Sequence, residues 1–167
     1  LPAPVRPQVN WTRNLSAPIT APVAISGMVF VAERERHTLH ALSAMDGKPA
    51  WTFIADGRID SPPTVFNGLC LFGTRNGFVY CLRASDGAVA WRFRAAPRDR
   101  RIFACEQLES AWPIHGSVLV NESTLIVAAG RSSYLDGGIH IYRLDPSTGR
   151  ELSQTIMHSL APKTSDQ

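Results

Sequence analysis

Several features that would mark an enzyme or a membrane protein are missing from this sequence. No apolar run approaches the roughly 18 residues that a membrane-spanning helix needs. No segment of ten or more residues shows the apolar periodicity of a helix. The five histidines are scattered, without a nucleophile-elbow motif or a metal-ligand spacing. We therefore expect no membrane span, no catalytic residues, no cofactor-binding residues and no metal ligands.

Cysteine is scarce, with only Cys70, Cys81 and Cys105 in the chain. An odd number without a spacing motif is not a disulfide framework, and neither zinc nor covalently attached haem has support. Cys70 and Cys81 flank a tight turn and could face one another. Free cysteines, however, usually behave as small buried hydrophobic residues.

Neither sign of charge is in large excess. The net charge is +3 over 167 residues, with an isoelectric point of about 9.0. A balance this mild does not indicate nucleic-acid binding, which requires a concentrated basic surface. The hydrophobic content of 44% is enough for one domain with a core.

What the sequence does contain is a repeat. Leu39–Trp51, LHALSAMDGKPAW, recurs without a gap as Val79–Trp91, VYCLRASDGAVAW, at a spacing of 40 residues. Trp11 falls on the same period. A weaker third copy, Ile141–Ser153, begins 62 residues after the second and has Ser153 in place of the tryptophan. A fixed period near 40 residues indicates a repeat architecture.

Each repeat holds four short apolar runs separated by turn signals. In the first they are Val23–Ile25, Met28–Val31, Thr38–Leu42 and Ala50–Ile54. Runs this short and rich in β-branched residues are typical of strands. Asn-Gly and Asp-Gly pairs between them supply the positive φ of tight hairpins. Each repeat is therefore predicted to be a four-stranded antiparallel meander.

Such meanders, repeating about every 40 residues, are typical of β-propeller blades. We predict an all-β fold: a partial propeller of about three four-stranded antiparallel blades, at 21–55, 61–95 and 112–157, with an extra N-terminal outer strand at Val9–Leu15. A β-sandwich and a β-solenoid are alternatives, but tandem identity at this period is unusual in sandwiches and solenoid coils are shorter. Residues 1–8 and 158–167 read as linkers, rich in proline and small polar residues.

The pattern hydrophobic-x-Ala-Leu-x-Ala-x-x-Gly-x-x-x-Trp resembles the propeller repeat of pyrroloquinoline quinone (PQQ) dehydrogenases. Their non-catalytic bacterial relatives share it, including the periplasmic propeller lipoprotein of the outer-membrane barrel assembly machine, and the chain looks closer to these. The resemblance implies a periplasmic or cell-envelope location. It also implies that each tryptophan docks against the neighbouring blade, with alanine and glycine leaving room. The implied docking sets are Ala44, Gly47 and Trp51, and Ala84, Gly87 and Trp91.

The repeat is interrupted twice, by residues 97–116 before the third blade and by residues 130–138 within it. In an A-B-C-D meander the D–A and B–C connections share a face, so both insertions are expected on the same face, where function in repeat proteins gathers. All the loops expected on that face together carry eight arginines and eight acidic residues, so we expect mostly solvated surface charge without a net field. The candidate partner-binding residues are Arg98, Arg100, Arg101, Phe103, Trp112, His115, Arg131 and Tyr134.

The aromatic candidates have two interpretations. They bind a partner, in which case Trp112→Ala would spare stability, or they anchor the long loops.

Two functions follow. The first is a non-catalytic binding or scaffold module of a larger bacterial PQQ-like propeller protein, acting through the face with the insertions. Its expected partner is protein, either the remaining blades or another chain, since propellers close with about four to eight blades. The alternative is a fragment of a PQQ-dependent dehydrogenase with PQQ and calcium. The resemblance implies that such an enzyme needs an adjacent cysteine pair, which this sequence lacks.

Overall fold

The computed structural model describes residues 8–104 and 106–159. Its strands are β1 (Val23–Ile25), β2 (Met28–Glu33), β3 (Thr38–Ser43), β4 (Pro49–Ile54), β5 (Thr64–Phe66), β6 (Leu69–Gly73), β7 (Phe78–Arg83), β8 (Val89–Arg94), β9 (Arg101–Ala104), β10 (Gln107–Ser110), β11 (Leu119–Asn121), β12 (Thr124–Ala129), β13 (Ile139–Leu144) and β14 (Glu151–Met157). No helix in the described part of the chain is long and apolar enough to cross a membrane. Both expected linkers fall almost wholly outside the described residues.

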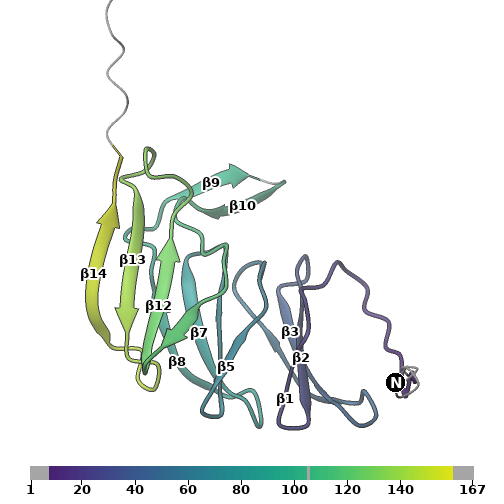
Figure 1. Ribbon diagram of the computed structural model, residues 1–167. Helices are drawn as coiled ribbons and strands as arrows, with labels where there is room; N and C mark the ends of the chain where they lie inside the picture. Colours follow the sequence, from purple (N-terminus) through teal and green to yellow (C-terminus); the bar gives the residue numbers. More distant parts are fainter. Residues whose placement is uncertain (1–7, 105, 160–167) are drawn as a thin grey trace, which may run out of the picture.

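The strands form three antiparallel four-stranded sheets, β1–β4, β5–β8 and β11–β14, each in sequence order. Figure 1 shows the sheets side by side in chain order, with the hairpin β9–β10 projecting from one end. The predicted partial propeller is therefore confirmed, and we call the sheets blades 1, 2 and 3. The hairpin inside the insertion was not predicted.

The tight turns follow from local chemistry. Ser26-Gly27 and Asn67-Gly68 each place two successive residues at positive φ, 50° and 75° in the first and 47° and 76° in the second. This is the geometry of the hairpin turns that match strand twist. Blade 3 makes the corresponding turn with Glu122 and Ser123, at 46° and 66°, although neither is glycine. Strand pairing on both sides holds that strained turn in place.

Two apolar clusters fill the spaces between blades. The one between blades 1 and 2 includes Phe30, Leu39, Phe72 and Tyr80, with the Phe72 and Tyr80 rings stacked at 5.5 Å. The cluster between blades 2 and 3 includes Leu71, Val79, Leu125, Val127 and Tyr142. Alternate residues of β6 and β7 therefore face opposite neighbours, as the two-residue strand period requires.

The tryptophans join consecutive blades. Trp51, at the end of blade 1, donates a hydrogen bond from Nε1 to the Ala84 carbonyl of blade 2 at 2.9 Å. Its ring covers Gly87, where a Cβ would lie 2.7 Å from the indole. The same contacts link Trp11 with Ala44 and Gly47, and Trp91 with Pro146 and Gly149. The docking sets therefore combine residues of adjacent repeats. Both expected groupings are corrected: Trp51 does not dock with Ala44 and Gly47, and Trp91 does not dock with Ala84 and Gly87.

The N-terminal segment does not form the expected strand at Val9–Leu15. A strand needs a neighbouring ladder, and the described residues provide no inner strands for it. Trp11 still docks on blade 1, and Ser16 donates from its backbone and its hydroxyl to Glu33 at 2.7 and 3.0 Å. The segment therefore covers the outer side of blade 1 as an irregular strap.

At the opposite end of the stack, no described residue covers the outer side of blade 3. Arg143 pairs with Ser153 in blade 3 at the position where blade 2 has Cys81 opposite Trp91. Leu119 and Met157, on the same side of this sheet, are 58% and 53% exposed. The outer side of blade 3 is thus partly apolar but lacks the docking indole.

Cys70 and Cys81 are both free and buried. Cys70 lies opposite Leu82 and Cys81 opposite Leu71, so the two thiols belong to different interblade clusters. Burial raises the pKa of each thiol to about 12. Both therefore act as small buried hydrophobic residues, the interpretation preferred from the sequence. Cys105 lies outside the described residues.

Two glycine substitutions isolate the docking contact. Gly27 and Gly87 have nearly the same φ, 75° and 74°, but a Cβ at Gly27 would meet no atom within 4 Å. Both Gly27→Ala and Gly87→Ala should lose about 1–2 kcal/mol to the left-handed backbone. Gly87→Ala should lose about 1–3 kcal/mol more, because its Cβ collides with Trp51.

Urea denaturation of both variants checks this, and Trp51→Ala alone should cost about 3–5 kcal/mol. When Trp51 is already replaced by Ala, Gly87→Ala should lower the free energy of unfolding by no more than Gly27→Ala does. Equal losses in the two glycine variants would refute docking as a significant source of stability.

Candidate protein-binding face

The two insertions meet on one side of the molecule. Trp112 Nε1, in the first insertion, donates to the Asp136 carbonyl of the second at 2.9 Å, and Gly130 N donates to the Pro113 carbonyl at 3.0 Å. Arg100 forms an ion pair with Asp136. We call this side the loop face; it is formed by the connections 34–37, 56–63, 74–77, 97–116 and 130–138. The turn face, opposite, carries the short A–B and C–D turns.

Trp112 is an anchor of the loop face. Its side chain is buried in the core between blades 2 and 3, with 3% exposure, and its ring meets His140 edge-on at 6.3 Å. The expectation that Trp112→Ala would spare stability is therefore corrected. Long loops are held by their own large apolar side chains, the alternative that the sequence left open.

A network of buried charges lies beneath the loop face. Asp60, with 8% of its side chain exposed, accepts from Arg58 Nε at 2.7 Å and Arg34 Nη2 at 3.2 Å. Arg75 also pairs with Asp60 and donates from Nη1 to Glu109 at 2.8 Å. These residues come from blade 1, the connection after it, blade 2 and the hairpin, so the network ties separate elements together.

Burial by itself would raise the pKa of Asp60. His115, whose Nδ1 lies 3.7 Å away, and the guanidinium groups of Arg75 and Arg58 outweigh it, and the Asp60 pKa lies well below its usual range. The carboxylate is therefore ionised at neutral pH. It holds three arginines that would otherwise repel one another.

Glu109 is the second centre of the network. Its side chain is 1% exposed and contacts Arg75 from blade 2 and Arg131 from the extension of blade 3. The expectation of solvated charge is corrected for these residues. Charge counting missed the network because Asp60 and Glu109 are far apart in sequence and Arg75 contacts both of them only in the folded chain.

Other predicted residues remain at the surface. Arg98 and Arg101 are exposed, Tyr134 is 56% exposed and Phe103 is 77% exposed. Phe103 lies directly opposite Leu108 in the hairpin, and Leu108 is 58% exposed. Sequence analysis missed Leu108, because its pairing with Phe103 depends on the register of this hairpin. The pair forms an apolar patch on an element that projects from the blades (Figure 1).

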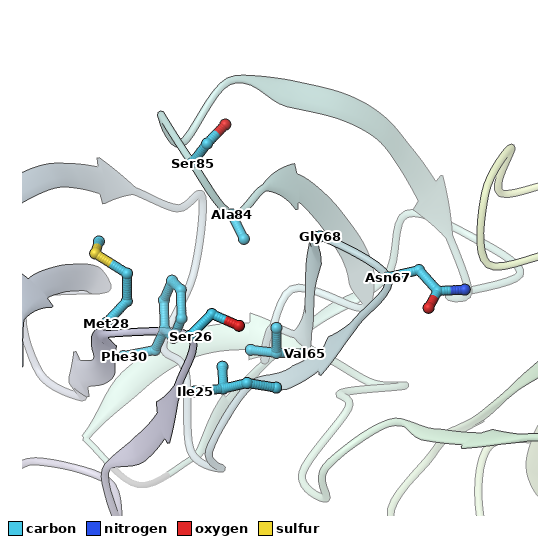
Figure 2. Close-up of a pocket in the computed structure, with 9 residues that line it drawn as sticks. All are labelled: Ile25, Ser26, Met28, Phe30, Val65, Asn67, Gly68, Ala84 and Ser85. Atoms are coloured by element: carbon cyan, nitrogen blue, oxygen red, sulfur yellow. The ribbon is translucent and has the colours of Figure 1, made fainter.

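A pocket of about 500 Å³ opens at the turn face between blades 1 and 2. Figure 2 shows Met28 and Phe30 from blade 1 beside it, with Ala84 and Ser85 from blade 2. Its walls are mostly aliphatic and aromatic. Among the described residues, no group of three or more His, Cys, Asp or Glu side chains could hold a metal ion.

Stacked four-stranded blades, joined by tryptophans that dock on the next repeat, define this chain as a segment of a PQQ-like β-propeller. A family model described as outer membrane protein assembly factor BamB matches residues 6–166, and the chain belongs to this family. BamB of Yersinia pestis is 37% identical over 78 residues, which are 47% of this chain and 20% of that protein. The chain therefore spans only a small part of this relative.

Solved structures agree on the fold. BamB from Moraxella catarrhalis matches 88% of this chain and 39% of its own, with a TM-score of 0.64 and 18% identity. A quinohemoprotein alcohol dehydrogenase from Pseudomonas putida matches 89% of this chain and 22% of its own, with a TM-score of 0.73 and 17% identity. At such identities the similarity shows the fold alone.

Within residues 8–104 and 106–159, the buried carboxylates do not fit a calcium and PQQ site. Calcium requires several free oxygen ligands, whereas the buried carboxylates Asp60 and Glu109 are already engaged by arginines. The sequence also lacks adjacent cysteines.

Asp60→Asn tests the buried network. Removing this charge leaves Arg34, Arg58 and Arg75 without their shared partner and should cost about 3 kcal/mol at pH 7. Because the folded pKa of Asp60 is lowered, its contribution is complete above the unfolded value, about 3.9, and is lost as the pH falls below it. The difference between wild type and variant should be constant from pH 7 to about pH 5 and shrink below about pH 4.

Urea denaturation across this pH range measures the difference. Asp99→Asn is the control, because the Asp99 side chain is 79% exposed, and it should change stability little. A difference that persists undiminished at pH 2.5 would contradict the assigned role.

Proposed function

We propose that this chain is a non-catalytic protein-binding module of a larger bacterial propeller protein, and that the loop face is its binding surface. The observation that carries the proposal is the exposed Phe103–Leu108 pair on a projecting hairpin. Exposed aromatic and aliphatic side chains with polar surroundings are typical of protein interfaces. Tyr134 and Leu135, 56% and 62% exposed, extend the apolar surface on the neighbouring insertion.

The family suggests the partner. The matched relatives are named as outer membrane protein assembly factors. We infer that the partner of this chain is a protein component of outer-membrane assembly, met in the periplasm or elsewhere in the cell envelope. The buried network supports such a role, because a rigid base keeps a projecting hairpin preorganised and lowers the entropy lost on binding.

Photo-crosslinking in the native bacterium tests the binding surface. A benzoylphenylalanine placed at Phe103 or Tyr134 should crosslink to an outer-membrane assembly protein, identified by mass spectrometry. The same group at Met45, which is 87% exposed on the turn face, is the matched control and should not. Crosslinking of that protein mainly from Met45 would show that the loop face is not the binding surface.

The bare side of blade 3 suggests a second contact, made within the propeller. Leu119 and Met157 are exposed there, and a blade face is a large apolar surface that soluble monomers rarely leave open. We propose that further blades of a longer polypeptide cover it, with a second copy of the chain as the runner-up.

Light scattering of the isolated chain checks this second contact. The chain should self-associate, and Leu119→Lys with Met157→Lys should reduce the association by introducing charge on that side. Phe103→Lys is the control for association through the loop face. A wild-type monomer with sharp two-state unfolding would mean that the exposed side needs no cover.

A further inference from the structure

A polar pocket of about 280 Å³ lies where the loop face meets the outer strand of blade 2. Four arginines line it: Arg92 and Arg94 from β8, and Arg98 and Arg101 from the first insertion. Asp56, after β4, and Asp99 are the acidic residues of its lining. Arginine thus outnumbers acid by two to one here, although charges balance over the loop face as a whole.

One of these arginines is held in position. The Arg92 guanidinium stacks over the Phe78 ring, 3.9 Å from its centroid, and Nη1 donates to the Tyr80 hydroxyl at 3.3 Å. Stacking fixes the plane of the guanidinium and leaves its remaining N–H groups free to donate. A positioned cation loses less entropy on binding an anion than a mobile surface side chain does.

The pocket's own acids do not neutralise it. Among the described residues, the only one of these four arginines with an ion pair within 4.0 Å is Arg101, at 3.7 Å from Asp99. Asp99 is itself 79% exposed. Asp56 accepts from the Thr74 hydroxyl at 3.1 Å and also hydrogen-bonds with Tyr80, to whose hydroxyl Arg92 donates. Guanidinium groups converging on a pocket favour a carboxylate or phosphate, whose oxygens match their N–H groups.

The pocket is continuous with the apolar pair. Arg101 and Phe103 are alternate residues of β9 and share its exposed side, with the less exposed Ile102 between them on the other. Phe103 faces Leu108 across the hairpin. An anion bound by the arginines would therefore have an apolar surface beside it. This combination suits a peptide better than a free small anion.

We propose that this arginine pocket binds the carboxylates of an acidic protein segment, while Phe103 and Leu108 hold an adjacent apolar side chain of the same segment. The inference rests on the proposed function of the loop face in protein binding. It adds the chemistry of the segment bound: clustered Asp or Glu beside Phe or Leu.

A fluorescent octapeptide, Glu-Asp-Glu-Phe-Glu-Leu-Asp-Glu, is the probe, with anisotropy as the measurement. It should bind the wild-type chain, and Arg94→Gln with Arg98→Gln should weaken binding by at least about tenfold, because charge-assisted hydrogen bonds are lost. Phe103→Ser with Leu108→Ser should weaken it severalfold. Arg150→Gln, an exposed arginine on the turn face, is the matched control and should stay within about twofold. Circular dichroism confirms that each variant is folded.

Three results would overturn the inference: no binding by wild type, an equal loss with Arg150→Gln, or displacement of the peptide by inorganic phosphate below about 1 mM, which would define a small-anion site. A probe with Ser in place of Phe and Leu should bind more weakly, and equal binding would refute the role of the apolar pair. The anisotropy titration measures peptide binding to the pocket independently of the crosslinking experiment. Crosslinking from Phe103 with no peptide binding would leave the proposed function standing and reject this inference alone.

Discussion

The stacking of the blades depends on a tryptophan whose indole ring packs against the following blade. Trp51 closes blade 1, but the surface that covers it belongs to blade 2, where Gly87 leaves the backbone bare and the Ala84 carbonyl accepts the indole N–H. Trp11 and Trp91 repeat the arrangement. Blades 1 and 2 thus each supply a tryptophan to the next blade, and blades 2 and 3 each supply a glycine turn to the blade before. Stability in such a chain resides largely in nearest-neighbour interfaces.

The interfaces are held together at three levels. The tryptophans lock the turn face, apolar side chains fill the middle, and Asp60 and Glu109 bind arginines from several elements beneath the loop face. Buried ion pairs contribute little net stability compared with apolar packing, but they specify geometry because an unpaired member is costly. This network fits a role in fixing the base of the insertions. The hairpin above it can then expose Phe103 and Leu108 without collapsing onto the blades.

The sequence predicted what is local and repeated. Strand positions and turns follow from short apolar runs and Asn-Gly or Asp-Gly pairs, and the period located the tryptophans that dock. It did not predict contacts that occur once. Val9–Leu15 matches an outer strand in pattern but has no described partner strands, and Trp112 lies in a loop whose burial depends on blades 2 and 3 together. Counting charges balanced Arg75 against Glu109 without showing that they meet, because they lie 34 residues apart.

The docking geometry also explains where the chain tolerates insertions. A C–D turn carries both the carbonyl and the glycine that a preceding tryptophan needs, so an added residue there would displace the indole. Among the described residues, the D–A and B–C connections receive no tryptophan from the preceding blade; the hydrogen bond between Trp112 and Asp136 joins the two insertions to each other. Longer loops there cost only a slowly growing closure entropy. Residues 97–116 and 130–138 both lie in connections of that second kind. The tryptophan contact thus leaves the loop face as the side where new binding elements can accumulate without weakening the stack.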